Sequence, residues 1–183
     1  HQRDAKLDAR SYHLVLLAAN MTGYQNLLKL VTTAHMEGFY YRPRIDRELL
    51  AEHSEGLICL SGCISGQVAS LVQEGQLDQA RRAIGWFKEL FGPDRYFIEL
   101  QRHAGVPELE QINAQLVDLA REAGVRCVAT NDVHYTLREN AFAQELLLAL
   151  QTNTTLSDPN RMRMGSDDYY LMSPEEMRQL MAD

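Results

Sequence analysis

Cysteine and long apolar runs are both scarce in this sequence, and each scarcity disfavours a class of protein. Three cysteines occur, an odd number, and none belongs to a Cys-x-x-Cys motif, which disfavours a disulfide framework and a four-cysteine zinc site. A reducing, cytoplasmic setting fits this usage best. The longest apolar runs, such as residues 146–150, are far shorter than the roughly 20 residues that span a bilayer. No signal peptide is visible, so the sequence predicts no membrane partner.

Basic residues are also few relative to acidic residues. The sequence has 18 Lys and Arg against 25 Asp and Glu, for a formal net charge of -7. This balance argues against a chain that grips duplex phosphates by itself, because such binding needs a basic stripe. It is compatible with cation binding, since cations neutralise clustered carboxylates. With 183 residues, 45 % of them hydrophobic, the chain is long enough for one domain with a sizeable core.

What the sequence does contain is an alternation of strand and helix patterns. The predicted strands cover residues 13–18, 56–61, 96–100 and 125–130, the last of them an apolar run typical of a buried strand. The predicted helices cover residues 22–37, 65–74, 77–91, 107–124 and 139–150, with Ser65 as a cap and Gly92 and Gly124 as stops. This alternation implies right-handed crossovers and a largely parallel sheet, open or closed into a barrel. The predicted fold class is therefore α/β.

The last thirty residues differ from this pattern. Residues 152–166 are polar and irregular, which is typical of a linker. The capping box Ser173-x-x-Glu176 predicts one more helix, which would belong to a following region. The sequence therefore predicts a division into residues 1–150 and 151–183. Because it starts at His1 without Met, we expect it to be a piece of a longer protein.

Four side chains near strand ends are candidates for chemistry: His13, Cys63, Asp132 and His134. Cys63 and the Asp132-x-His134 pair each follow a predicted strand, where functional groups gather in parallel α/β folds, whereas His13 opens its strand. His, Cys and Asp are a plausible zinc ligand set. Structural roles are the alternative. In that case Asp132 satisfies backbone donors, Cys63 fills the core as a small hydrophobe, and His13 bonds a backbone carbonyl.

Five phrases that occur together favour the chemical interpretation. They are residues 18–27, 38–46, 60–63 (Leu-Ser-Gly-Cys), 129–135 (Ala-Thr-Asn-Asp-Val-His-Tyr) and 173–177 (Ser-Pro-Glu-Glu-Met). In this order and approximate spacing they resemble the bacterial replicative DNA polymerase III alpha subunit, over nearly the whole chain. The matched region is similar to the later part of that family's N-terminal polymerase and histidinol phosphatase (PHP) domain.

The resemblance implies a fold and a metal site. The fold is part of a distorted seven-stranded β/α barrel, with the first strands missing from this sequence. The ligands of Zn²⁺ or Mn²⁺ that it implies, position by position, are His13, Cys63, Asp132 and His134. The family's earlier ligand motifs, among them a His-x-His, are absent because the sequence begins after them. The polymerase carboxylates that bind Mg²⁺ are expected beyond Asp183, so we predict no DNA synthesis by this chain alone.

The resemblance also implies a function for the whole protein, a DNA-directed DNA polymerase. Its implied partners are primer-template DNA, a proofreading exonuclease and a sliding clamp in the cytoplasm. For the PHP region, one hypothesis is metal-dependent hydrolysis of 3′ phosphodiesters, which removes misincorporated nucleotides. The second is a structural metal domain that braces the polymerase and docks a separate exonuclease, and the Cys63 thiolate favours it. A stand-alone phosphatase of the same superfamily is a third alternative, which the match of residues 38–46 disfavours.

Two other histidines are secondary candidates. His103 follows the end of the 96–100 strand, which makes it the better candidate for an outer metal position, because strand ends line the mouth of a barrel. His35 lies late in a helix. A surface or capping position is the alternative for both.

A basic cluster formed by Arg42, Arg44 and Arg47 is a further candidate, for contact with DNA or a neighbouring domain. Neighbouring acidic residues dilute its charge, which favours a solvated loop. The adjacent Tyr40-Tyr41 pair could stack on a base, but we expect it to pack this loop down.

Overall fold

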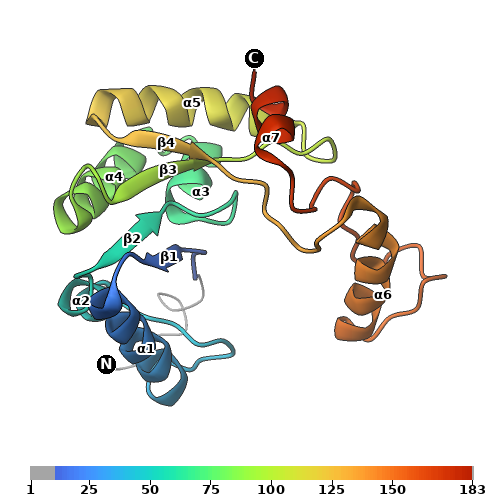
Figure 1. The fold of residues 1–183 in the computed structure, drawn as a ribbon, viewed down its shortest axis with the longest axis horizontal. Coiled ribbons are helices and arrows are strands. Elements are labelled where there is room, and N and C mark those ends of the chain that lie inside the picture. The colour runs from blue at the N-terminus through green and yellow to red at the C-terminus, as the bar shows by residue number, and fades with distance from the viewer. Residues whose placement is uncertain (1–10, 183) are drawn as a thin grey trace. The chain divides into compact units, whose positions relative to one another are not determined.

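The computed structural model in Figure 1 describes residues 11–182 of the chain. The strands within this range are β1 (Val15–Ala18), β2 (Leu57–Leu60), β3 (Tyr96–Leu100) and β4 (Arg126–Ala129). The helices are α1 (Met21–Met36), α2 (Arg47–Glu52), α3 (Gln67–Gln73), α4 (Leu77–Phe91), α5 (Glu108–Ala123), the 3₁₀ helix η1 (Arg138–Asn140), α6 (Ala141–Gln151) and α7 (Pro174–Leu180). The predicted α/β class and each predicted element are confirmed. No helix in this range combines the length and the apolar character that a bilayer crossing requires.

The strands form one sheet in the order β1-β2-β3-β4. β2 and β3 are parallel, with Cys59 opposite Tyr96, as alternation with helices predicts. β1 runs antiparallel to β2, with Ala18 opposite Leu57. The predicted largely parallel sheet is therefore wrong at this edge. The described residues form four strands, so a seven-stranded barrel stays a prediction.

The connection between β1 and β2 explains the reversed pairing. Residues 19–56, which include α1 and α2, leave the sheet after Ala18 and return to it beside the point of departure. The Ala19 amide donates a hydrogen bond to the Gly56 carbonyl at 2.9 Å. A Cβ on Gly23 of α1 would lie 1.9 Å from the same carbonyl oxygen, so the helix approaches this backbone as closely as only glycine permits. A strand–helix–strand pattern in the sequence does not show which end of the sheet the chain returns to. Return to the same end gives an antiparallel pair of strands, and a crossover to the opposite end gives a parallel pair.

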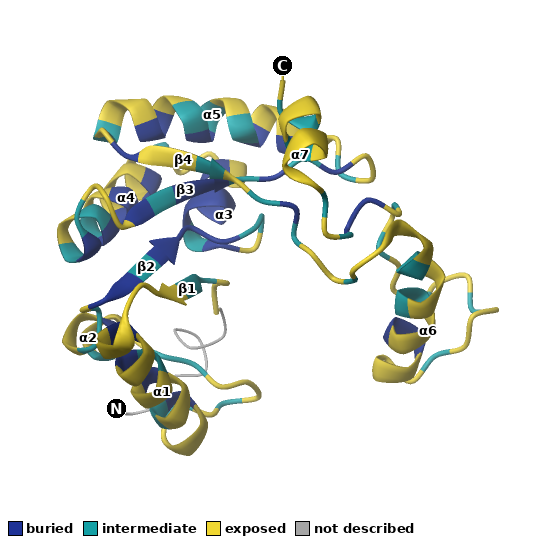
Figure 2. Ribbon diagram, in the orientation of Figure 1, coloured by how far each residue is buried: buried dark blue, intermediate teal, exposed yellow. Residues whose placement is uncertain are grey.

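The chain divides into two compact units, and the first comprises residues 11–99 and 115–127 of the described range. In this unit α1 lies against β1 and β2, while α4 lies against α3 and β2 (Figure 1). The buried side chains of α4 recur at helical spacing, which gives the helix one apolar face: Ala80, Ala83, Ile84, Phe87 and Phe91. The Phe87 ring stacks on Tyr96 of β3, with centroids 5.2 Å apart. β2 and β3 are the most buried strands (Figure 2).

The second unit comprises residues 100–114 and 128–182 of the described range. As predicted, residues 152–166 contain no helix or strand. They are nevertheless attached to α6, because Arg161 forms a largely buried ion pair with Glu145. The predicted capping box of α7 is confirmed, since Ser173 and Glu176 each accept a hydrogen bond from the other's backbone amide. The predicted boundary after residue 150 stays a prediction.

Two local predictions are wrong: the N-terminal cap of α3 and the burial of β4. The cap of α3 is Gly66 and not Ser65, because the Ser65 carbonyl accepts the His13 amide at 3.1 Å and so belongs to the preceding loop. β4 is not a buried strand, since three of its four residues are exposed (Figure 2). It lies at the edge of the sheet, where the structure describes no further strand to cover it.

The basic cluster is only partly the solvated loop that the sequence favours. Arg47 begins α2, whose N-terminus is capped by Asp46, and its guanidinium lies 4.5 Å from the centroid of the Trp86 ring. Arg44 stays in a loop, where it donates to the Tyr40 carbonyl at 2.6 Å and lies over the Tyr40 ring. Both arginines are therefore occupied by contacts inside the chain. Tyr40 also packs edge-on against Tyr41, but Tyr41 remains 84 % exposed.

Candidate metal-binding site

Two of the four predicted ligands, His13 and Cys63, lie in contact. His13 Nδ1 is 3.1 Å from Cys63 Sγ. Glycine makes this approach possible. Gly62 has a φ of +82°, and a Cβ on it would lie 2.6 Å from the His13 carbonyl oxygen. The preceding Ser61 fixes the other side of the turn, because its buried hydroxyl accepts the Glu99 amide at 2.9 Å.

The His13–Cys63 pair fits a borderline-soft divalent cation in its donor chemistry. A thiolate and an imidazole on one tetrahedral zinc ion lie about 3.6 Å apart, given Zn–S and Zn–N bonds of about 2.3 and 2.0 Å. The observed 3.1 Å is a hydrogen-bond distance, so a small outward movement of either side chain would convert this pair into two ligands. Cys63 is half-buried and His13 is exposed.

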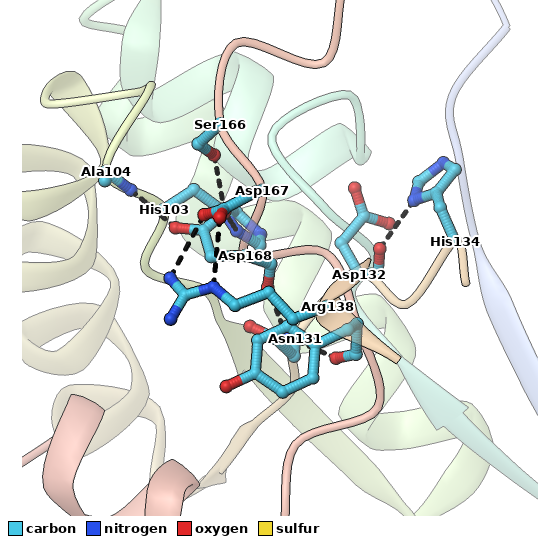
Figure 3. Close-up of polar contacts among 10 residues, drawn as sticks. His103, Ala104, Asn131, Asp132, His134, Arg138, Ser166, Asp167 and Asp168 are labelled. Atoms are coloured by element: carbon cyan, nitrogen blue, oxygen red, sulfur yellow. Dashed lines mark hydrogen bonds and ion pairs between the residues drawn. The ribbon is translucent and has the colours of Figure 1, made fainter. Parts of the chain in front are cut away.

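Asn131 anchors the loop that carries the other two predicted ligands. This buried side chain donates from Nδ2 to the backbone carbonyls of Asp168 at 2.7 Å and Tyr170 at 2.8 Å. Asp132 follows with a φ of +44°, a left-handed conformation that is uncommon outside glycine and that often occurs at functional sites. Figure 3 shows the Asp132 and His134 side chains beside one another.

The hydrogen bonding of His134 prepares one ring nitrogen for a metal. Its Nδ1 lies 2.6 Å from the backbone oxygen of Asp132. Because a carbonyl only accepts, Nδ1 carries a hydrogen, and in the neutral ring Nε2 then presents a lone pair, as in metal-bound histidines. Within residues 11–182 the Asp132 carboxylate has no hydrogen-bond partner, so its oxygens remain available. This pair also fits a divalent cation.

Residues 2–103 match the PHP domain, which is more than half of the 183 residues. The chain belongs to the PHP domain family. It is 47 % identical to the DNA polymerase III subunit alpha of Thermus aquaticus over 182 residues. It is also 47 % identical to that of Treponema pallidum over 171 residues and 48 % identical to that of Deinococcus radiodurans over 167 residues. These alignments cover 100 %, 93 % and 91 % of the chain, but only 15 %, 14 % and 12 % of the respective relatives.

The two donor pairs lie in different units, His13 and Cys63 in the first and Asp132 and His134 in the second, and His13 and Cys63 alone fall within the matched residues 2–103. Among the described residues, no group of three or more His, Cys, Asp or Glu side chains forms a metal site. Each pair supplies two donors, whereas a protein zinc site uses three or four. The assignment of all four residues as ligands therefore stays a prediction.

Of the two secondary histidines in the PHP region, only His35 matches the structural alternative. It is exposed, and its Nδ1 lies 2.9 Å from the Val31 carbonyl oxygen. His103 is instead 5 % exposed, so a surface position is wrong. Its Nδ1 lies 3.2 Å from Asp168 Oδ1, and its ring stacks on Tyr169 with centroids 4.1 Å apart.

Asp168 is a site residue that sequence reasoning missed. Burial alone would raise the pKa of its carboxyl group, but hydrogen bonds from Ser166, the Ala104 amide and His103 together lower it below the ordinary value. It is thus a charged group held by three donors (Figure 3). An aspartate inside a polar, irregular stretch gives no local signal of such a role, because its partner His103 lies 65 residues away.

Proposed function

We propose that the protein containing this chain is a replicative DNA-directed DNA polymerase of the DNA polymerase III alpha type. The observation that carries the proposal is 47 % identity to such a subunit along 100 % of the chain. Because the chain spans about 15 % of the length of that relative, polymerase activity with Mg²⁺ belongs to the whole protein. So do the partners that we propose: primer-template DNA, a proofreading exonuclease and a sliding clamp in the cytoplasm.

Within that protein, we propose that this chain forms part of a seven-stranded PHP barrel with a zinc or manganese site. The residues that would hold the ions are His13, Cys63, Asp132 and His134. Support comes from the donor chemistry of both pairs and from the His134 Nδ1 bond to the Asp132 carbonyl, which leaves Nε2 as the ligand atom of the neutral ring. When bound, such an ion supplies Lewis-acid chemistry at a phosphodiester. Hydrolysis of 3′ phosphodiesters, hence proofreading, is the first function that we propose for the region.

Cys63 supports a second candidate, a structural metal site that braces the polymerase and docks a separate proofreading exonuclease. Its thiol is half-buried and contacts His13, and thiolate ligands are common in structural zinc sites. In this case metal binding contributes to folding free energy rather than to hydrolysis.

Asp132→Asn and His134→Ala in the full-length protein test the site itself. Each substitution removes a donor, so bound zinc or manganese after dialysis should fall clearly in both, by about tenfold in affinity or more. His35→Ala is the matched control, because this histidine is exposed and bonds only its own helix. Elemental analysis gives the measurement. Unchanged metal content in both ligand variants would show that the site is assigned wrongly.

Cys63→Ser separates the two candidate functions, with Cys127→Ser, an exposed cysteine, as its control. A hydroxyl is a poor replacement for a soft thiolate ligand. A structural site predicts a lower melting temperature and a parallel loss of polymerase activity. A hydrolytic site predicts slower metal-dependent release of 3′ nucleotides with the melting temperature retained. If neither quantity changes, Cys63 has no part in either function.

A further inference from the structure

Residues 166–171 form a segment, here called the strap, that lies along the loop carrying Asp132 and His134. The backbone amide of His134 donates to the Tyr169 carbonyl at 2.8 Å, and the Leu171 amide donates to the Tyr135 carbonyl at 3.1 Å. These bonds pair the strap with the loop in the manner of a short parallel bridge between Tyr135 and Tyr170. The backbone position of His134 is therefore tied directly to the strap.

Buried side chains fix the strap in this position. Asp168 accepts hydrogen bonds from His103 at 3.2 Å and from the Ala104 amide at 2.9 Å. The His103 side chain is 3 % exposed and that of Asp168 is 10 % exposed, so water screens this pair little. Asn131 holds the strap from the other side through its two bonds to backbone carbonyls. Figure 3 shows the contacts of His103 and Ala104 with the Asp168 carboxylate.

Tyr169 links the strap to the His134 ring through a direct ring contact. It is 6 % exposed, and one of its neighbours is the stacked His103 ring at 4.1 Å. The His134 ring contacts it edge-on, with centroids 5.7 Å apart and an interplanar angle of 90°. A displaced strap would therefore move both the backbone and the ring of His134.

We propose that Asp168, His103 and Asn131 are positioning residues for the metal site, acting through the strap on Asp132 and His134. This inference rests on the proposed metal-binding function. It adds that the strap, a segment of the same chain, holds the metal ligands in position. Residues that orient metal ligands typically change affinity by about 10–100-fold when they are lost. Coupling of this kind is reciprocal, so bound metal must in turn stabilise the docked strap.

Metal affinity of Asp168→Asn in the full-length protein is the first test, measured by competition with a chromophoric chelator for Zn²⁺. Asparagine can keep only part of the three-donor arrangement, so we expect about tenfold weaker binding. Asp118→Asn makes the same chemical change in an exposed ion pair and should bind like the wild type. Glu145→Gln removes the charge from a largely buried ion pair of the same unit, whose partners among the described residues, Arg161 and Met164, precede the strap. It therefore controls for general loss of stability, and it too should bind like the wild type.

Hydrogen exchange of the wild-type protein with and without Zn²⁺ is the second test, and it needs no variant. Metal should slow exchange of the peptide amides of residues 166–171, and this protection should disappear in Asp168→Asn. Equal affinity in Asp168→Asn and wild type, or equal weakening in Asp168→Asn and Glu145→Gln, would overturn the role of the strap. The metal site would then still stand if His134→Ala loses the ion. A wild-type protein that binds no Zn²⁺ or Mn²⁺ would overturn the metal site and the strap's role together.

Discussion

The two donor pairs are positioned by different physical means. His13 and Cys63 meet because a backbone turn packs against the start of β1 at a distance that only glycine allows at Gly62. Asp132 and His134 lie in a loop that depends on the hydrogen bonds of buried polar side chains, chiefly those that Asn131 donates and Asp168 accepts. One arrangement depends on the absence of a side chain, and the other depends on the presence of several.

This difference determines what each pair tolerates. A steric arrangement responds to added volume and is indifferent to charge, whereas a polar arrangement responds to lost hydrogen bonds and to protonation. Substitutions that add one methyl group, delete one amide or remove one charge should therefore act selectively on one pair or the other.

Gly62→Ala should have the largest effect and should be confined to the first pair. A positive φ costs alanine about 1 kcal/mol, and overlap with the His13 carbonyl adds about 1–3 kcal/mol. Hydrogen exchange in the full-length protein should show a lower free energy of local opening at residues 62–66 and at the His13 amide. The two costs together should lower it by about 3 kcal/mol.

The control for Gly62→Ala is Gly75→Ala. Gly75 has a similar φ of +71° but no atom within 4 Å of an added Cβ, so this variant reports the conformational cost alone, about 1 kcal/mol. Equal effects at both positions would show that packing against His13 does not determine the first pair.

Asn131→Ala should have the next largest effect, at the second pair. It leaves the carbonyls of Asp168 and Tyr170 without their donor, which costs about 2 kcal/mol. Exchange of amides in residues 132–135 and 166–171 should accelerate accordingly, while residues 62–66 stay unchanged. Asn160→Ala, at an exposed position, should change neither segment. Equal acceleration at residues 62–66 would contradict independent positioning of the pairs.

Acid should loosen the strap beside the second pair. We expect a smaller effect than those of Gly62→Ala and Asn131→Ala. Because the folded state lowers the pKa of Asp168, this carboxylate adds stability above its unfolded pKa of about 3.9, and the contribution is lost as pH falls through the folded value. The difference in strap opening between wild type and Asp168→Asn should therefore shrink as the pH falls below about 4. A difference that grows below this pH would mean that the sign of the Asp168 shift is wrong.

The sequence predicts the elements of this fold better than their pairing. β3 was predictable to its exact bounds, because an apolar run follows the stop at Gly92. α2 escaped prediction, since six residues are too few to show helical periodicity. The antiparallel course of β1 also escaped, because it depends on where the 19–56 excursion ends in space.

The candidate site was predictable only where local motifs carry it. The Leu-Ser-Gly-Cys and Asn-Asp-Val-His phrases single out Cys63, Asp132 and His134 from their places after strands, and the structure shows how each is oriented. Asp168 and the burial of His103 were not predictable, because their pairing joins an irregular stretch to a distant strand end. Contacts between segments without periodic pattern leave no trace in a single sequence.

The closure of the 19–56 excursion has an evolutionary consequence. Its two ends meet at the Ala19–Gly56 hydrogen bond and the Gly23–Gly56 contact, so the register of β1 against β2 is independent of the length of chain between them. Insertions or deletions near the exposed Tyr41 would change the excursion and leave the sheet in place, since surface loops of this kind accept length changes at little cost. A change in the length of this segment is therefore compatible with an unchanged contact between His13 and Cys63.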